Sequence, residues 1–302
     1  MIRLKRNKNK IKGCMSDKIF DVINTIVLTL ILIVVAYPLI IAVSSSFSSG
    51  VALLQGKVIL FPVDFHLEGY KVVTQNKQVL TGLYNSCYYT IAGTVINMAV
   101  SILAAYPLSR KDFRPRTFIN LLVAFTMLFG GGIIPQYILV KDLGMYNTRW
   151  AMLIPSAMSA WNMILIRNYF QNGIPESLFE SARLDGCDDW RYLFNIALPV
   201  SLPTIAVVTL YYAVANWNAF FSGYMYLQNP QLRPLQVILR DILLMSQADD
   251  IAPISGEEAQ VPALFEVLKY SLVVVSSLPM ALLYVSAQKY FTKGLMVGSV
   301  KG

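Results

Sequence analysis

The spacing of charged residues along the chain limits its fold more than any other feature of the sequence. An ionisable side chain at the centre of a bilayer costs a few kcal/mol or more, and a spanning helix needs roughly 20 apolar residues. Windows without Asp, Glu, Lys or Arg therefore locate candidate spans. The chain has six such windows: 22–56, 78–109, 117–140, 150–166, 192–232 and 270–288.

These windows predict an all-α polytopic membrane protein, which agrees with a chain of 56% apolar and only 14% charged residues. We expect six transmembrane helices, near 20–43, 83–108, 117–139, 149–168, 201–222 and 267–287. The third span contains three glycines and a proline within 129–135, which predict a kink or an early end. Such a kink could serve gating or only helix packing.

Lysine and arginine are distributed unevenly between the two sides of the predicted bundle. Both terminal tails and the second and fourth loops together hold 17 of them, against eight on the other side. Short basic segments stay in the cytoplasm, so both termini are predicted to be cytoplasmic. The basic tail suits anionic membrane lipid, which accounts for most of the +8 net charge without any nucleic acid.

This topology divides the chain into three parts. A basic cytoplasmic tail at 1–19 precedes a six-helix transmembrane domain at 20–287, and a second cytoplasmic tail occupies 288–302. The domain includes an outside segment at 45–82, a cytoplasmic loop at 171–199 and a long outside loop at 223–261 that is acidic near its end. Loops of that length are often functional.

The residues that usually carry catalysis or metal binding are scarce. Cys14, Cys87 and Cys187 form neither a disulfide nor a metal framework, and the single His66 is interpreted as an ordinary surface residue. No G-x-x-x-x-G-K-[ST] phosphate loop occurs. We therefore predict no catalytic residue, no metal site and no cofactor in this chain.

The loop at 171–199 contradicts the expectation that cytoplasmic loops are basic. Its three arginines face five acidic residues, which are Glu176, Glu180, Asp185, Asp188 and Asp189. Acids stabilise the first turn of a helix, and proline also fits there, so we expect a helix at about 175–184. Gly186 tolerates the left-handed conformation that closes a helix, and Asp188 can cap a second short helix through Ile196.

Two short helices set at an angle would form a compact structure held close under the membrane. The expected apolar stripes are Leu178, Phe179 and Ala182 on the first helix and Trp190, Leu193 and Phe194 on the second. A stripe of this kind either docks into a partner or packs against the chain's own bundle. The residues alone leave both alternatives open.

The same loop resembles a known family signature. Glu180-Ser181-Ala182, then Gly186 after three intervening residues, and the ending Ile196-x-Leu198-Pro199 resemble the EAA motif of ABC importer permeases, with Ser181 in place of the first alanine of that motif. The resemblance implies a type I ABC importer permease fold, in which this loop is a coupling helix that sits in a cleft of the ATPase. The implied ATPase-coupling residues are Glu180, Ser181, Ala182, Asp185, Gly186, Ile196, Leu198 and Pro199.

Three further stretches, 103–116, 125–144 and 288–302, resemble the carbohydrate branch of that family, near the smaller maltose permease subunit and a subgroup for complex oligosaccharides. The resemblance implies a bacterial cell-membrane protein that works in a heterodimer with a second permease subunit. It also implies two ATP-binding subunits that hold ATP and Mg, an extracellular solute-binding protein and a carbohydrate substrate. The residues from 294 onward would reach the ATPase interface, and the long outside loop would contact the binding protein.

A sugar path needs aromatic faces and amide or hydroxyl groups, and the stretch 209–221 supplies both. The substrate-path candidates are Tyr212, Asn216, Trp217 and Asn218, with Asn85, Ser86, Tyr89, Asn97 and Asn162 as weaker ones. For each residue, hydrogen bonding between helices is the alternative.

Other transport mechanisms fit the sequence less well. An ion-coupled secondary transporter or channel usually keeps carboxylates or histidines at membrane depth, and the six windows contain none. An ABC permease for a solute other than sugar and a membrane scaffold without transport activity also remain as alternatives.

Overall fold

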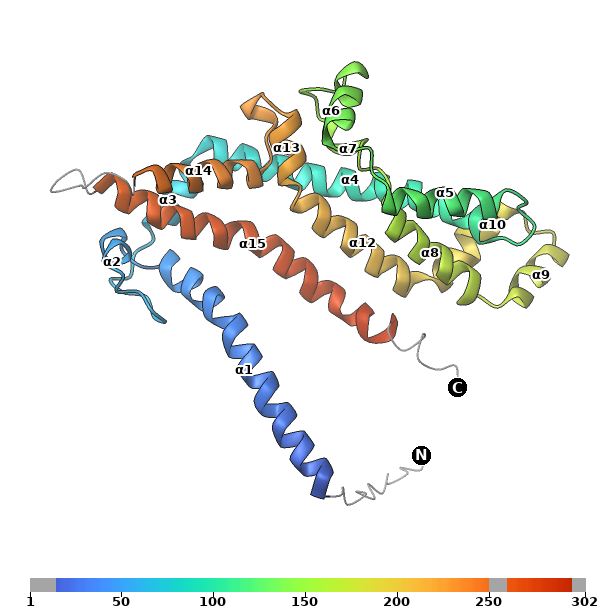
Figure 1. Ribbon diagram of the computed structural model, residues 1–302, viewed down its shortest axis with the longest axis horizontal. Coiled ribbons are helices and arrows are strands. Elements are labelled where there is room, and N and C mark those ends of the chain that lie inside the picture. The colour runs from blue at the N-terminus through green and yellow to red at the C-terminus, as the bar shows by residue number, and fades with distance from the viewer. Residues whose placement is uncertain (1–14, 250–259, 295–302) are drawn as a thin grey trace.

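The computed structural model describes residues 15–249 and 260–294, and within these ranges the chain forms helices and turns but no strand (Figure 1). This confirms the all-α prediction. The longer helices are α1 (Met15–Ser46), α4 (Lys77–Ser109), α5 (Arg116–Leu128), α6 (Ile133–Asp142), α8 (Ala160–Asn172), α9 (Glu176–Leu184), α12 (Leu202–Trp217), α14 (Leu235–Asp249) and α15 (Gln260–Gly294). The shorter ones are α2 (Gly50–Leu54), α3 (Glu68–Gln75), α7 (Trp150–Leu153), α10 (Asp189–Tyr192), the π-helix η1 (Leu193–Ala197), α11 (Leu198–Val200), α13 (Phe220–Tyr226) and the 3-10 turn η2 (Pro230–Leu232).

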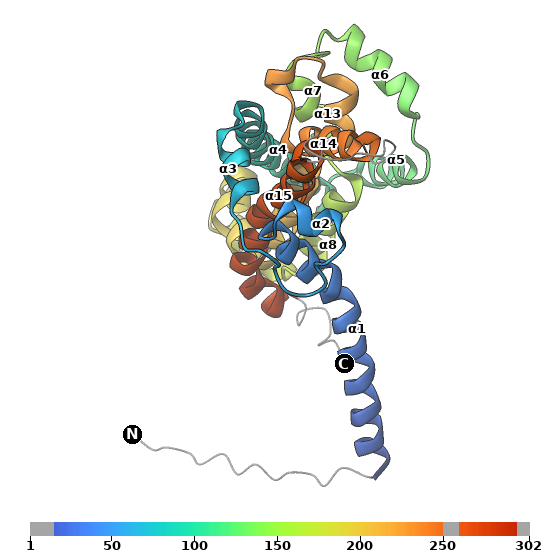
Figure 2. The same ribbon diagram turned by 90° about the vertical axis from the view of Figure 1, so that its left-hand side faces the viewer.

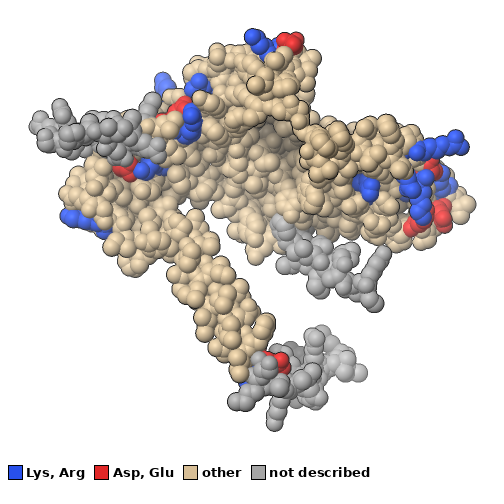
Figure 3. Space-filling model, in the orientation of Figure 1, with Lys and Arg blue, Asp and Glu red and all other residues tan. Residues whose placement is uncertain are grey.

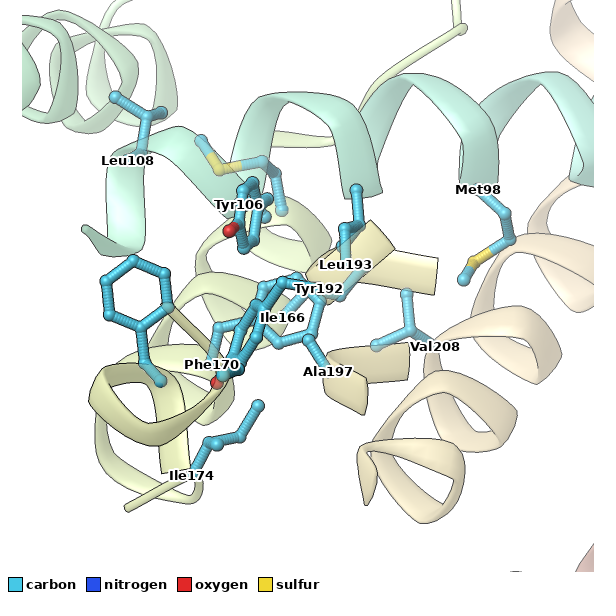
Figure 4. Packing of buried hydrophobic residues seen from close by; sticks show 14 of the residues in the cluster. Met98, Tyr106, Leu108, Ile166, Phe170, Ile174, Tyr192, Leu193, Ala197 and Val208 are labelled. Carbon is cyan, nitrogen blue, oxygen red and sulfur yellow. The ribbon is translucent and has the colours of Figure 1, made fainter. Parts of the chain in front are cut away.

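Helix α4 is the centre of the bundle and packs against α8 and α12. Their buried side chains form one core, to which α4 contributes Met98 and Tyr106, α8 contributes Ile166 and α12 contributes Val208 (Figure 4). Tyr192 from α10 completes the same core. The short helices α9 and α10 are thereby attached to the bundle at the end of α4.

A second core lies at the opposite end of α4. There Val73 of α3 and Val79 of α4 pack with Leu235 of α14 and with Leu268 and Leu272 of α15. In Figure 1, α3 and α14 lie at the left-hand end of the molecule and α9 and α10 at the right-hand end. Segments predicted to lie outside and the loop predicted to be cytoplasmic are thus at opposite ends of the bundle.

Helix α1 projects away from this bundle (Figures 1 and 2). It contacts α15, but its most apolar stretch buries nothing in this chain, and side chains such as Leu32 and Val34 are 66% and 71% exposed. A wholly apolar exposed helix requires lipid or another membrane protein around it.

Three helices are long and apolar enough to cross a membrane alone: 17–46 in α1, all of α4, and 263–288 in α15. Two bent pairs add to these, α5 with α6 at 114° and the helical run Asp189–Val200 with α12 at 85°. By length and composition the described residues therefore contain three to five candidate spans, and the count of six and the cytoplasmic location of the termini stay predictions.

The break between α5 and α6 falls at the three glycines, as predicted. Gly132 adopts φ +84°, a conformation that glycine tolerates better than other residues. A Cβ on Gly130 or Gly131 would meet nothing within 4 Å. Packing inside this chain therefore does not explain these two glycines.

The single helix predicted at 149–168 is wrong. The chain forms α7 and α8 instead, separated by the segment 154–159. Pro155 lacks the N–H that a continuing helix needs, and a search for uncharged windows does not register it. The thirteen residues of α8 rise only about 20 Å, less than the roughly 30 Å hydrocarbon core.

The outside loop predicted at 223–261 is also wrong in part, because it contains helix α14. Leu235, Ile238 and Ile242 recur at helical spacing and are buried against α4 and α15. The helix predicted at 201–222 ends at Trp217, and α13 begins at Phe220. The acidic end of this loop, at 250–258, and the tails at 1–14 and 295–302 lie outside the described residues.

Candidate functional site

The acidic loop folds into two helical pieces, which we call the knob (residues 175–200). Helix α9 follows Pro175 and has Glu176 in its first turn, while α10, η1 and α11 form a second continuous helical run. The two-helix prediction is confirmed, but the second piece reaches Val200 rather than Ile196. Pro199 lies near the end of this run, just after the π-helix η1, where the regular hydrogen-bond ladder is already interrupted.

The turn between the two pieces follows from two residues. Gly186 has φ +75°, its N–H donates to the carbonyl of Arg183 at 3.0 Å, and the Cys187 N–H donates to Ala182 at 2.9 Å. This hydrogen-bond pair is a Schellman motif, which needs a left-handed residue at its centre. Asp188 then caps α10 by accepting from the Arg191 N–H at 3.0 Å.

The inner face of α9 is anchored by one aromatic side chain. Phe179 is buried, with the Arg110 guanidinium 3.1 Å from its ring centre and the Tyr192 ring edge-on at 5.0 Å. Tyr192 in turn lies beside Tyr106 of α4, and Tyr106 contacts Phe170 of α8 edge-on (Figure 4). A chain of aromatic contacts therefore ties the knob to two helices of the bundle.

Charged groups tie the same face to the loop between α4 and α5. Lys111 pairs with Glu176, and Arg183 pairs with Asp112 at 3.4 Å and with Asp189 at 3.8 Å. The Tyr106 hydroxyl donates to Asp189 at 3.1 Å. Lys, Arg, Asp and Glu gather at this end of the molecule, beyond a surface with few charges (Figure 3).

The five acids of the loop therefore have different roles. Glu176 and Asp189 hold the knob to the bundle, and Asp188 caps a helix. Glu180 and Asp185 are exposed and make no ion pair or side-chain hydrogen bond with any described residue. These two carboxylates are available to a binding partner.

The predicted coupling residues fall into an inner and an outer group. Ala182 is buried, and Ile196 and Leu198 pack against the same core. The outer group is exposed and consists of Glu180, Ser181, Asp185, Gly186 and Pro199. We expect this arrangement of an element that packs against the bundle on one side and is exposed on the other.

The predicted apolar stripes are wrong in two places. On α9, Phe179 and Ala182 face inward while Leu178 is 36% exposed. On the second piece, Leu193 is buried but Trp190 and Phe194 are 62% and 55% exposed and stack on each other at 6.2 Å. The sequence does not tell which of two neighbouring residues on a helix faces the bundle, because that depends on where the bundle lies.

The most exposed apolar residue of the knob is Leu184, at 89%. Sequence reasoning missed it. One signal in the sequence could have identified it: Leu184 comes five residues after Phe179, which places the two side chains on opposite sides of the helix. Leu184 lies between Ser181 and Asp185 in sequence, so the outer face combines one apolar tip with carboxylates.

A cavity of about 430 Å³ separates the knob from the α4–α5 loop. Residues of both signs line it, including Arg110, Lys111, Glu176, Glu180 and Arg183. Among the described residues no group of three His, Cys, Asp or Glu side chains could hold a metal ion.

The substrate-path candidate Tyr212 is buried between helices. Its hydroxyl lies 2.6 Å from Ser101 Oγ on α4 and accepts from the Ser159 N–H at 3.0 Å. Trp217 is buried too, and its indole N–H donates to the carbonyl of Ser276 on α15 at 3.0 Å. Both side chains join helices, which is the alternative that the sequence left open.

The two asparagines of this stretch are more accessible. Asn216 is half-buried and donates to Asn97 at 2.8 Å and to Thr94 at 3.3 Å, whereas Asn218 is exposed at the end of α12. The weaker candidates on α4 make hydrogen bonds to other elements: Asn85, Ser86 and Tyr89 bond to the backbone at 231–235, and Asn97 bonds to the carbonyl of Ser156 as well as to Asn216. Asn162 is buried on α8.

With this geometry established, comparison with known proteins decides the family. Residues 15–297 match the model of a family described as the inner membrane component of binding-protein-dependent transport systems. The chain belongs to that family.

The permease is similar to the polygalacturonan/rhamnogalacturonan transport system permease protein YtcP of Bacillus subtilis (strain 168). The two are 38% identical over 291 residues, which cover 95% of this chain and 100% of YtcP. Protein LplC of the same organism is 36% identical over 289 residues, covering 95% of this chain and 96% of LplC. The fold matches a chain of a bacterial ABC transporter involved in the import of the acidic polysaccharide alginate, with a TM-score of 0.83, 34% identity and coverage of 92% and 99%.

The permease is thus a membrane-embedded transport subunit of an ABC importer, and its ATPase is a separate subunit. The family works with a partner permease, ATPases and a solute-binding protein. The predicted family, fold and membrane location are confirmed, and the ion-coupled alternative has no support.

Proposed function

We propose that the knob is the surface by which an ATPase subunit moves this permease. The observation that supports this most is the contrast between its two faces. The inner face is fixed by Phe179, Tyr192 and the Arg183 ion pairs, so a force on the knob reaches α4 and α8 directly. The outer face carries Leu184 and Asp185, with Glu180 at its edge beside the cavity of about 430 Å³, and all three side chains are exposed.

The outer face indicates what its partner should look like. An apolar tip such as Leu184 gains most free energy in an apolar pocket, whereas Glu180 and Asp185 favour basic or N–H groups around that pocket. A cleft on the ATPase with an apolar floor and a basic rim would meet both requirements. The permease would then switch between inward-facing and outward-facing states as two ATPase subunits, holding ATP and Mg, close on each other.

The remaining partners follow from the family and from the exposed surfaces. A second, different permease subunit would complete a heterodimer and cover part of the apolar surface of α1. An extracellular solute-binding protein would deliver the substrate at the end of the molecule that holds α3 and α14.

The proposed substrate is an oligosaccharide, and more narrowly an acidic one. YtcP is named for polygalacturonan and rhamnogalacturonan, and the solved relative imports alginate. Among the path candidates, the exposure of Asn218 and the partial exposure of Asn216 support these two as the side chains that would meet a sugar. Tyr212 and Trp217 would position α12.

The knob assignment can be tested with substitutions that reverse or add charge on its outer face. Glu180→Lys and Gly186→Asp should release the ATPase subunits from the purified importer and abolish substrate-stimulated ATP turnover. Asp142→Lys makes the same charge reversal as Glu180→Lys at an exposed site on α6 and should retain the ATPase. Full retention of the ATPase by both knob variants would contradict the assignment.

The substrate class can be tested separately in the importer assembled with its binding protein. Oligogalacturonides should raise ATP turnover, and neutral maltodextrins of equal length should not. Stimulation by the neutral sugars alone would refute an acidic substrate while leaving the knob assignment intact.

A further inference from the structure

A second cavity, of about 270 Å³, lies where α4, α5 and α8 meet. Leu108, Arg116, Thr117, Asn120, Arg167 and Gln171 line it. Apart from Gln171 it shares no residue with the cavity beside the knob, so it is a separate feature of the molecule.

The charge in this cavity is of one sign, because two arginines line it without an aspartate or glutamate. Arg167 makes no ion pair with any described residue, and its Nε is buried without a hydrogen-bond partner. Arg116 makes one hydrogen bond, from Nη1 to the carbonyl of Arg110 at 3.3 Å. Arg110 also has a buried Nε without a hydrogen bond, but it has Asp112 at 4.0 Å, and Arg183 has Asp112 at 3.4 Å.

Arg167 and Arg116 are half-buried, and a polar atom that is buried without a partner, such as the Nε of Arg167, is costly because buried polar groups are almost always paired. Asn120 adds a second buried polar atom without a partner, its Oδ1. Guanidinium donors without an acid favour an anion, and phosphate matches their geometry especially well. The amide of Asn120 can pair with a hydroxyl or oxygen of the same ligand.

The surroundings of the cavity indicate where such an anion comes from. Arg116 and Thr117 begin α5, and the start of a helix favours negative charge. On the face that continues from Thr117, α5 presents Leu121 and Leu128, which are 67% and 81% exposed. A phosphate in the cavity would therefore have an apolar helix face beside it, where acyl chains can lie.

We propose that this cavity is a binding site for a phosphate group, and that in the membrane the phosphate belongs to an anionic phospholipid headgroup. Basic pockets between spanning helices on the cytoplasmic side bind such headgroups, and the distribution of Lys and Arg predicts that side for this cavity. Soluble phosphate has the same recognising chemistry, so the test separates the two sources.

The test uses the complete importer and native mass spectrometry after incubation with phosphatidylglycerol or phosphatidylcholine. Wild type should retain phosphatidylglycerol, and Arg116→Gln/Arg167→Gln should retain about tenfold less or lower, since each basic residue near a membrane surface contributes severalfold. Arg114→Gln/Lys141→Gln removes the same charge from exposed sites that do not line the cavity, and it should bind as wild type does.

Arg116→Lys/Arg167→Lys keeps the charge and should recover part of the binding, which separates loss of the site from loss of folding. A parallel arm adds millimolar inorganic phosphate to importer that has been loaded with phosphatidylglycerol, and phosphate binding itself is measured on lipid-depleted importer. Lipid retention that phosphate does not displace supports the headgroup, whereas displacement by phosphate supports a site for soluble anions. Equal phosphatidylglycerol and phosphate binding by wild type and the glutamine variant would overturn the site.

Discussion

The knob and the arm formed by α5 and α6 (residues 116–142) are stabilised in different ways. The knob buries Phe179, Ala182, Tyr192 and Leu193 in the main core and adds ion pairs to the α4–α5 loop. Helix α5 has no buried residue, and α6 buries only Val140. The same chain thus contains two elements of about equal length, one that it holds firmly and one that it hardly holds.

This difference suits the two elements to different roles in a transport cycle. An element that buries its own base can transmit force to the bundle, which a coupling surface requires. An element with exposed apolar faces depends on lipid or on another subunit, and its break at 129–132 lets it change direction. Four predictions test this contrast, from the largest expected effect to the smallest.

The largest effect is expected from Phe179→Ala. Losing a buried aromatic ring costs about 3–5 kcal/mol, so the knob should lose its fixed position and the importer its coupled ATP turnover. Limited proteolysis of the purified importer should detect new cleavage within 175–200. Phe118→Ala, on the exposed face of α5, should change stability by about 0.5 kcal/mol or less; similar losses from both variants would remove the contrast.

A smaller effect is expected from changing the knob's turn. Gly186→Ala places a Cβ where nothing lies within 4 Å, so its cost is the backbone strain of φ +75°, about 1–2 kcal/mol. Gly186→Asn should cost less, because asparagine tolerates this conformation. Thermal unfolding measures both costs. If the Gly186→Asn variant keeps its stability but no longer binds the ATPase, then glycine is needed for close contact with the ATPase rather than for the backbone conformation.

In the arm, replacing glycine by alanine should raise the stability rather than lower it. Gly130 and Gly131 have neither a positive φ nor a neighbour in the way, so alanine at each should stabilise by about 0.4–1 kcal/mol. If bending at this break serves gating, the double alanine variant should retain the ATPase but transport more slowly. Unchanged transport by proteoliposomes containing this variant would argue that the break has no part in gating.

The smallest effect is expected from the pair of Lys111 and Glu176. Both side chains are more than half exposed, at 66% and 55%, and exposed pairs contribute about 0.2–1 kcal/mol. A double-mutant cycle with Lys111→Gln and Glu176→Gln measures this coupling. A coupling well above that range would show that ion pairs, rather than the buried aromatic anchor, hold the knob.

Local chemistry made the knob predictable from the sequence. The hydrogen bonds of Gly186 and Asp188 join residues that are only a few positions apart, so these two residues form the turn without help from the rest of the bundle. The kink at 129–132 was predictable for the same reason, because the glycines that cause it lie within the kink itself. The family signature added which partner the loop faces, and the family match confirms the importer permease.

Features that depend on the packing of distant residues were not predictable. Which of Leu178 and Phe179 turns inward is decided by Arg110 and Tyr192, which come from other elements. The interruption at Pro155 and helix α14 were missed because uncharged windows ignore proline and exclude amphipathic helices that carry charge. The pairing of Arg183 with Asp112 likewise needed the fold.

The central claim is that the outer face of α9 contacts the ATPase, and a photo-crosslinking amino acid at Leu184 tests it most directly. In the assembled importer, irradiation should join the permease to an ATPase subunit. The same probe at Phe61, which is 79% exposed and belongs to a segment predicted to lie outside, should not. A Leu184 probe that joins the solute-binding protein, or that leaves the ATPase unlabelled while the importer is intact and active, would contradict the account.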